Sequence, residues 1–228
     1  DHRDLHSFPT RRSSDLGKMP LFLVPYGYGE AQFVEKRSKF IARVWRCESE
    51  REALDHISEM RTRHWDATHN VYAYFIRDGQ ISRYSDDGEP QGTAGVPVLE
   101  VFRRENIQNY CCVVTRYFGG VLLGAGGLVR AYAHSAKLAL EAAGVAEMRS
   151  ACIAVISCPY QLYDRIRAEL ASLGGEIRDS NYGVDIKLEI SIPKENYGPL
   201  ADRMNELSSG SISPVFISEE YIPVKIER

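Results

Sequence analysis

Two glycine-containing motifs hold the residues whose types and spacing could do chemistry. The first, RYSDDGEPQGTAG, runs from Arg83 to Gly95, and the second, TRYFGGVLLGAGGLVRAY, runs from Thr115 to Tyr132. Together they contain eight glycines, at places where a packed core has no use for glycine. Both motifs therefore predict loops whose backbone can come close to another group.

The second motif has the composition of an anion site. Its glycines are Gly119, Gly120, Gly124, Gly126 and Gly127. Glycine lets backbone N–H groups approach a ligand, and the helix predicted to follow adds about half a positive charge at its start. Arg116 before the turn and Arg130 in the helix add two guanidinium groups. The motif predicts a cradle for an anion, most simply phosphate; the alternative is a tight strand-to-helix turn that binds nothing.

The first motif clusters carboxylates. Asp86, Asp87 and Glu89 fall within four residues of one another. Clustered carboxylates can hold magnesium or serve as acid and base. They can equally accept hydrogen bonds from the backbone of a tight loop, or pair with Arg83 and Arg116. No histidine or nucleophile joins them at a telling spacing, which favours the structural interpretation over a metal or catalytic site.

Histidine and aromatic residues surround both motifs. His64 and His69 flank a predicted strand, where a lone histidine is more often a surface residue than a ligand. Tyr84, Tyr117 and Phe118 lie beside arginines, and exposed aromatic rings in such places can stack on nucleic-acid bases. Tyr72 and Tyr74 belong to the same aromatic set and share one face of their strand, which favours packing within the sheet over stacking on bases.

Hydrophobic periodicity indicates the elements that must position the two motifs. The expected strands are Ala31–Lys36, Lys39–Arg46, Asn70–Arg77, Ile81–Ser85 and Asn109–Arg116. The expected helices are Glu48–Arg63, capped by Ser49, Val96–Arg104 and Leu128–Ala143, which stops at Gly144. Asp78-Gly79 is a strong hairpin signal between two of the strands.

After Gly144 the pattern restarts as β-α-β-β-α-β, the ferredoxin-like arrangement. Its expected strands are Cys152–Cys158, Glu176–Asn181, Val184–Ile192 and Ser213–Ile217, and its helices are Gln161–Leu173 and Pro199–Leu207. The expected fold class is α+β, with a first domain over residues 19–147 and a second over residues 148–228.

The first sixteen residues, DHRDLHSFPTRRSSDL, lack apolar periodicity and resemble a translated sequencing-adapter read. Met19 has the character of the natural start, so residues 1–18 are expected to be a non-native or disordered leader. No apolar run approaches the ~18 residues of a membrane helix, and no signal peptide is recognisable. We therefore expect a cytoplasmic protein without a membrane partner.

Cysteine and charge content narrow the class further. The five cysteines show neither CxxC spacing nor a Cys/His cluster, which predicts reduced thiols rather than zinc or a disulfide framework. The net charge is −3, with residues 21–150 neutral and residues 151–228 at −4. Any basic footprint for nucleic acid must therefore be a local patch on the first domain.

The stretches SDDGEPQGTAG and RYFGGVLLGAGGLVRAY, in this order and about thirty residues apart, closely resemble the YigZ/IMPACT family. The resemblance covers roughly Gly29–Gly144, and the C-terminal segment is similar to the small domain that bacterial members append. It implies the fold of ribosomal protein S5 domain 2 for the first domain and a ferredoxin-like domain of elongation factor G for the second. It also implies a link to translation, which the eukaryotic relatives regulate under stress through protein partners.

Matching the family motifs residue by residue gives a candidate surface for a ligand or nucleic acid. Its residues are Arg83, Ser85, Asp86, Asp87, Glu89, Thr93, Arg116, Tyr117, Gly119, Gly120, Gly124, Gly126, Gly127 and Arg130. Some members carry lysine where Leu122 stands, so this turn is less basic than theirs. No catalytic residue, metal ligand or cofactor is expected.

The function that these residues favour is a non-enzymatic protein that binds RNA or the ribosome and regulates translation. Its expected partners are RNA or the translation machinery, with a protein partner also possible. Two alternatives stay open: a protein-interaction regulator without direct RNA contact, and a metal-dependent hydrolase that uses Asp86, Asp87 and Glu89.

Overall fold

A computed structural model describes residues 22–226 of the 228-residue chain. These residues divide into a larger unit, residues 22–148 with 223–226, and a smaller unit, residues 149–222. The boundaries fall within two strands, β7 (Val145–Cys158) and β10 (Val215–Ile226). The predicted leader, residues 1–18, lies outside the described residues, as does Met19.

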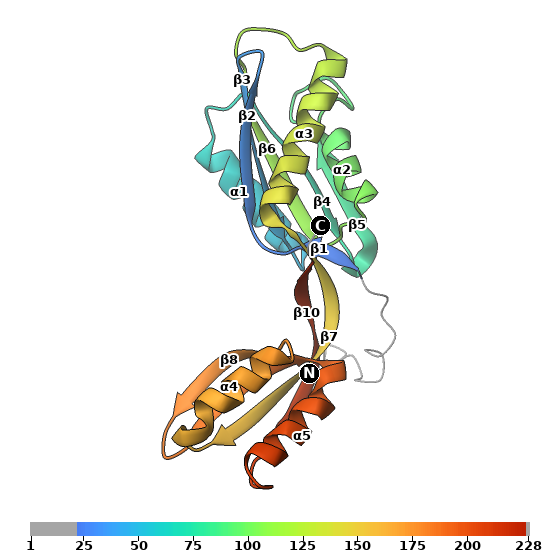
Figure 1. The fold of residues 1–228 in the computed structure, drawn as a ribbon. Helices are drawn as coiled ribbons and strands as arrows, with labels where there is room; N and C mark the ends of the chain where they lie inside the picture. The colour runs from blue at the N-terminus through green and yellow to red at the C-terminus, as the bar shows by residue number, and fades with distance from the viewer. Residues whose placement is uncertain (1–21, 227–228) are drawn as a thin grey trace, which may run out of the picture. The chain divides into compact units, whose positions relative to one another are not determined.

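The larger unit is built on a five-stranded antiparallel sheet with the strand order β2-β3-β6-β4-β5 (Figure 1). The strands are β2 (Gly29–Glu35), β3 (Ser38–Arg46), β4 (His69–Ile76), β5 (Ile81–Ser85) and β6 (Tyr110–Tyr117). The Asp78-Gly79 hairpin signal is confirmed: a short 3-10 turn, η2 (Asp78–Gln80), joins β4 to β5, with Gly79 at φ 75°. β6 is therefore the central strand.

Helices cover both faces of this sheet (Figure 1). The helices are α1 (Glu50–Arg63), α2 (Gly95–Arg104) and α3 (Ala125–Ala143). One hydrophobic core joins the sheet to α2 and α3, and a second joins its other face to α1. Cys112 lies in the first core and Cys111 in the second, as alternating side chains on a strand require. Burial on both faces explains why β6 is almost continuously apolar.

Local sequence signals set the helix ends. Ser49 caps α1 by accepting a hydrogen bond from the N–H of Glu52, while the Glu52 carboxylate accepts one from the N–H of Glu48. With Ser49 as its cap, the helix starts at Glu50, two residues later than the predicted Glu48. Helix α3 starts at Ala125, three residues before the predicted Leu128, and its first turn includes Gly126 and Gly127.

The smaller unit has the element order β7-α4-β8-β9-α5-β10 and the strand order β10-β7-β9-β8. Its elements are α4 (Tyr163–Ser172), β8 (Glu176–Tyr182), β9 (Ile186–Pro193) and α5 (Tyr197–Leu207), with short 3-10 turns η3 (Tyr160–Leu162) and η4 (Lys194–Asn196) before the helices. Alternate residues of β9 point into a core shared with both helices. The predicted β-α-β-β-α-β order is thus present.

Two strands are longer than predicted. β7 begins at Val145 rather than Cys152, and within the larger unit its first residues pair with β1 (Leu23–Pro25). β10 extends to Ile226, well beyond the predicted end at Ile217. Most residues of β10 are half-buried, so neither a buried run nor a strict alternation marks its true length in the sequence.

The described residues also bear on the membrane and cysteine predictions. All five cysteines are buried and free. Between residues 22 and 226, no helix combines the length and apolar character that crossing a membrane needs.

Candidate functional site

Asp86 holds the start of α2. Its Oδ1 accepts hydrogen bonds from the N–H groups of Ala94 and Gly95, at 3.1 and 2.8 Å, and its Oδ2 accepts one from Gly92 at 2.8 Å. These donors include N–H groups that a helix start leaves without a partner. The carboxylate of Asp86 is therefore used to cap a helix across the loop.

Asp87 ties the same loop to β4 and α1. Its Oδ2 accepts a hydrogen bond from the N–H of Asn70 at 2.6 Å, and its Oδ1 lies 3.0 Å from Nη2 of Arg61. The N–H of Asp87 donates to Oγ of Ser85 at 3.1 Å. Nδ1 of His69 lies 2.8 Å from the Asp87 carbonyl oxygen, and since a carbonyl only accepts, Nδ1 carries the proton.

Glu89 forms a buried ion pair with Arg116. Nη1 of Arg116 lies 2.5 Å from Oε1 of Glu89, and the two side chains are only 5% and 4% exposed. The same oxygen accepts a hydrogen bond from the Tyr132 hydroxyl at 2.7 Å and lies 3.6 Å from Nε2 of His69. Nη2 of Arg116 donates to Oγ of Ser38 at 3.2 Å. Burial, followed by the nearby Glu89 charge, raises the pKa of Tyr132, which keeps its hydroxyl proton available for this bond.

The three carboxylates therefore do not converge on one point. Asp86 faces the start of α2, Asp87 faces β4 and α1, and Glu89 points into the core beside Arg116. Thr93 also turns inward on its loop, donating to the Pro90 carbonyl oxygen at 2.6 Å. Within the described part of the chain, no three His, Cys, Asp or Glu side chains are grouped so that they could hold a metal ion. This geometry gives no support to the hydrolase alternative.

The glycine-rich loop packs against the turn between β2 and β3. A Cβ added to Gly119 would lie 2.0 Å from the carbonyl carbon of Arg37, so only glycine fits this approach. The N–H of Gly119 donates to Oγ of Ser38 at 3.3 Å, and that of Phe118 donates to Oγ1 of Thr68 at 3.0 Å. These two loop amides are therefore occupied by the protein itself.

The start of α3 is different, because no side chain caps it. Gly124, at φ 72°, precedes the helix, makes no side-chain cap, and is followed by a first turn without acidic residues. Nη1 of Arg130 would lie 3.6 Å from a Cβ added to Gly126, so its guanidinium reaches back beside this turn. Gly120, like Gly124, has a positive φ. The uncapped start of α3, with Arg130 beside it, is therefore the part of the predicted cradle that can still attract an anion.

Two predicted residues lie away from this end of α3. Tyr117 is on the opposite face of the sheet from Arg116, where its hydroxyl lies 2.9 Å from Nδ1 of His64 and 3.2 Å from the Asp66 carboxylate. Burial, and then the charges of Arg43 and Arg63, lower the pKa of His64. Arg83 is exposed on the edge strand β5 and donates to the Ser82 carbonyl oxygen.

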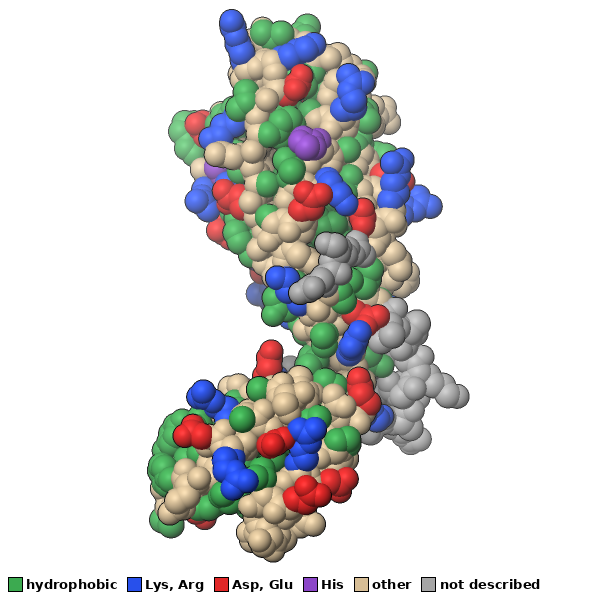
Figure 2. All heavy atoms as spheres, viewed as in Figure 1, with side chains coloured by type: hydrophobic (Ala, Val, Ile, Leu, Met, Phe, Trp, Pro, Cys, Tyr) green, Lys and Arg blue, Asp and Glu red, His purple; other side chains and the backbone are tan. Residues whose placement is uncertain are grey.

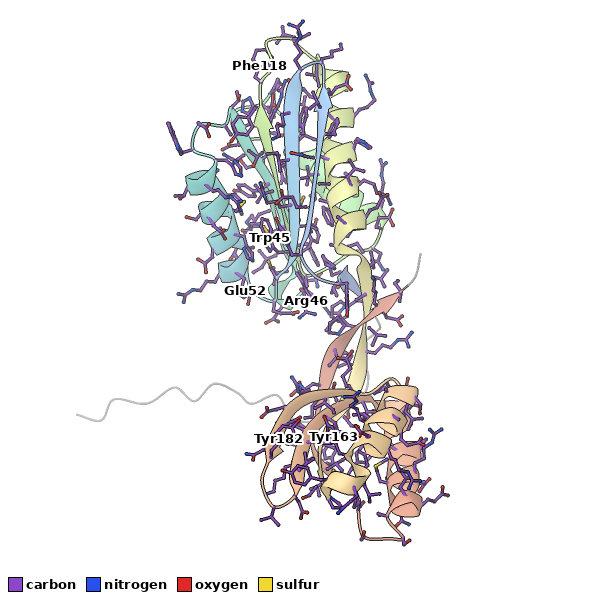
Figure 3. The ribbon with its side chains drawn as sticks, turned by 60° about the vertical axis from the view of Figure 1, so that its left-hand side comes forward. Trp45, Arg46, Glu52, Phe118, Tyr163 and Tyr182 are labelled. Atoms are coloured by element: carbon purple, nitrogen blue, oxygen red, sulfur yellow. The ribbon has the colours of Figure 1, made fainter. Side chains whose placement is uncertain are left out.

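A cavity of about 330 Å³ connects the buried ion pair to the start of α3. Glu89 and Arg116 line it together with Phe118, Leu122, Leu128 and the first residues of the helix. Figure 3 shows Phe118 at the end of β6, where the chain turns toward α3. Phe118 is 44% exposed and Leu122 is 81% exposed, so this cavity opens on an apolar rim.

Ser38 and Tyr132 were not predicted as members of this site, although both form hydrogen bonds with the ion pair. No local signal distinguishes them: Ser38 follows a turn, and Tyr132 occupies a helical position that suits the core equally well. The Lys36-Arg37 doublet, at the end of one predicted strand and just before the next, was an available signal for a basic turn, because charged residues gather where a hairpin reverses in solvent.

Comparison with known proteins places the chain in a family. The profile of the Impact N-terminal domain matches residues 36–140, and that of a domain of unknown function, DUF1949, matches residues 156–211. The chain is 38% identical to the IMPACT family member YvyE of Bacillus subtilis over 80% of its own length and 84% of that protein. It is 31% identical to the IMPACT family member YigZ of Escherichia coli, over 81% and 92% of the two chains.

A solved structure agrees with these matches. The crystal structure of a hypothetical protein aligns with a TM-score of 0.55 at 29% identity, covering 88% of this chain and 99% of that one. Two domain profiles in the expected order and two relatives matched over most of their length lead to one conclusion. This chain belongs to the IMPACT family, together with YigZ and YvyE.

Proposed function

We propose that this protein is a non-enzymatic regulator of translation that works in the cytoplasm by binding RNA or the ribosome. Membership of the IMPACT family supports the link to translation. We also propose that residues 19–147 have the fold of ribosomal protein S5 domain 2 and residues 148–228 that of a ferredoxin-like domain of elongation factor G. The strand order of the smaller unit supports the second assignment.

One observation carries the proposal: exposed cations gather at the end of the larger unit where α3 starts. This basic pole consists of Lys36, Arg37, Lys39 and Arg130, which are all exposed. None of the four forms an ion pair with another described residue. Figure 2 shows Lys and Arg side chains at this end, where the β2–β3 turn and the loop before α3 lie in Figure 1.

The fold holds this basic pole together. The contact between Gly119 and the backbone of Arg37 fixes the turn beside the glycine-rich loop, and Arg130 lies beside the uncapped start of α3. The charge of Arg116, by contrast, is neutralised by its buried ion pair with Glu89. The phosphate contacts that the motif predicted therefore fall to the exposed cations of the basic pole and to the amides of α3. A phosphate backbone that crosses this pole meets several positive groups at once.

The experiment compares RNA binding by the wild type and by a Lys36→Glu/Arg37→Glu variant over a range of salt concentrations. Each phosphate contact on a single strand contributes about −0.7 to the slope of log affinity against log salt, so four contacts predict a slope of about −3. The variant is expected to bind at least about tenfold more weakly and to lower the size of the slope by about 1.4.

The matched control is Arg51→Glu/Arg104→Glu, which makes the same charge change at exposed positions on α1 and α2 of the same unit. It is expected to leave both the affinity and the salt slope close to those of the wild type. Equal losses in the two variants would mean that net charge alone drives binding. Absence of salt-dependent binding by the wild type to RNA and to ribosomes would reject the proposal.

A protein partner is the second candidate, and the exposed Leu122 beside Phe118 favours it. The discriminating variant is Leu122→Asp, which adds a charge to the apolar rim without touching the basic pole. In an extract treated with nuclease, a protein bound by the wild type and lost with Leu122→Asp would support this candidate. Retention of the same protein by both would exclude the rim as its docking site.

A further inference from the structure

Two side chains that line the cavity beside the start of α3, Glu89 and Arg116, each carry a polar atom without a partner among the described residues. Arg116 is 4% exposed, and within the described residues its Nε–H has no acceptor. Glu89 uses Oε1 for its bonds with Arg116 and Tyr132, which leaves Oε2 without a donor among these residues. Buried polar groups are usually hydrogen-bonded, so an unpaired donor and acceptor in one cavity call for an explanation.

These two side chains favour a neutral ligand group that both donates and accepts. A cationic group would compete with Arg116 for Glu89, and an anionic group would compete with Glu89 for Arg116, since these two charges already neutralise each other at 2.5 Å. A flat group with a donor next to an acceptor can pair with both without disturbing them. The edges of nucleobases carry this arrangement of hydrogen-bonding groups.

The walls of the cavity suit the flat faces of such a ring. Phe118, Leu122 and Leu128 supply apolar surface, and the guanidinium of Arg116 already lies 5.5 Å from the Phe118 ring centre. Proteins that take up unstacked bases place them on aromatic rings and guanidinium planes. A volume of about 330 Å³ is at the small end of the range for ligand pockets, which suits one ring system rather than a longer segment.

The rim of the cavity supplies a place for an anion at one side only. Gly124 and Ala125 line it at the start of the 19-residue helix α3, whose first turn has no side-chain cap and no acidic residue. Backbone N–H groups and the helix dipole favour a negative group there. The cavity thus combines an anion site with an apolar slot and the neutral ion pair of Glu89 and Arg116.

We propose that this cavity binds one unstacked nucleotide of a single-stranded RNA, with its base in the slot and its phosphate at the start of α3. The proposal rests on the proposed RNA-binding function and names the unit of RNA that the site takes. The basic pole then holds the neighbouring phosphates, while the cavity holds a single base on Phe118 with its polar edge toward Glu89 and Arg116.

The test titrates the full chain with four probes: adenosine monophosphate, adenosine, ribose 5-phosphate and inorganic phosphate. Nuclear magnetic resonance or calorimetry measures each affinity. Adenosine monophosphate is expected to bind, and each probe that lacks the base or the phosphate is expected to bind at least about tenfold more weakly. The other three nucleoside monophosphates follow as a check on base preference.

Two pairs of variants separate binding from folding. Ala125→Glu places a carboxylate where the phosphate should lie, while it complements the helix dipole and is expected to raise the thermal midpoint. It should weaken binding of adenosine monophosphate by about tenfold or more, whereas Ala125→Gln should stay within about twofold of the wild type. Phe118→Ala should lose the affinity that Phe118→Tyr keeps, because only the second retains a ring for stacking.

The outcomes also distinguish this proposal from the function on which it rests. If RNA binding depends on Lys36 and Arg37 but not on Ala125→Glu, the basic pole stands and the nucleotide cavity is overturned. If adenosine monophosphate binds as expected but longer RNA and ribosomes do not, the cavity stands and the translation proposal falls. No binding of any nucleoside monophosphate, or a protein segment that occupies the cavity instead, would overturn the inference.

Discussion

Replacing Glu89 by alanine tests the buried ion pair with Arg116 in the larger unit. The substitution leaves the Arg116 guanidinium, whose side chain is 5% exposed, without its counter-ion. It also removes Oε1 of Glu89, the oxygen that accepts a hydrogen bond from the buried Tyr132 hydroxyl. The remaining contact of Arg116 with Ser38 is neutral and longer, at 3.2 Å, so it cannot replace the lost charge.

The expected loss is about 3–5 kcal/mol in the free energy of unfolding, because a charge left alone in a protein interior costs about that much. Domains are commonly stable by only about 5–15 kcal/mol, so this is a large fraction of the total. Glu89→Gln keeps the shape and an acceptor but not the charge, and should lose roughly 1.5–3 kcal/mol. Glu89→Leu combined with Arg116→Met should recover most of the loss, since two apolar groups replace the pair.

Urea unfolding followed by tryptophan fluorescence measures these changes. Both tryptophans, Trp45 and Trp65, belong to the larger unit, so the signal reports that unit alone. Glu100→Ala is the matched control: it breaks the exposed pair with Arg103 and should cost less than about 1 kcal/mol. A loss below about 1 kcal/mol for Glu89→Ala, or a double variant no more stable than Glu89→Ala, would refute the buried-pair reasoning.

Three further predictions concern the same unit and its cysteines. Gly119→Ala should destabilise by roughly 1–3 kcal/mol in the urea assay because its Cβ would meet the Arg37 backbone at 2.0 Å, whereas Gly126→Ala, in the first turn of α3, should be neutral or stabilising; equal effects would contradict the packing argument. None of the five buried cysteines should react quickly with a thiol reagent in the native protein, and all should react in urea. Burial also raises the pKa of Cys112, which keeps its thiol protonated and unreactive. Rapid labelling of the native protein would show that the cores open readily. Because burial lowers the pKa of His64, the unfolded chain takes up a proton more readily than the folded one, and stability should fall as the pH drops below about 6.5. Between about pH 7.5 and about pH 5.5, His64→Gln should lose less free energy of unfolding than the wild type does. An equal loss would assign the effect to other groups.

The elements that the sequence predicted well are those with strong local signals. Alternation marked β2 and β3, a continuous apolar run marked β6, and Asp78-Gly79 marked the hairpin between β4 and β5. These signals are written within a few residues, so one chain suffices to recognise them. The length of β10 was underestimated because its half-buried residues follow neither pattern, and β7 begins seven residues before its predicted start at Cys152.

The candidate site was harder to predict, because its chemistry depends on partners distant in sequence. The sequence identified two loops and the carboxylates that they carry, but it could not predict which backbone N–H group donates to each carboxylate. Asp86 meets Gly95 and Asp87 meets Asn70 only because the sheet brings β4 and α2 to the same loop. Pairings of this kind are fixed by strand register rather than by spacing.

Arg116 and Arg130 show the same limit most clearly. Both stand in one motif and both have the same chemistry, yet Arg116 continues the central strand β6 and is buried, while Arg130 lies on an exposed turn of α3. Glu89 of the first motif neutralises Arg116 of the second, so each motif contributes one side chain to the same buried ion pair. Besides Arg130, the free positive charge of the basic pole comes from residues outside the motif pair, and the turn that carries Arg37 lies close to the glycine-rich loop because Gly119 admits the Arg37 backbone. Membership of a motif therefore identifies which residues are held together, whereas burial decides which of them remain available to bind an anion.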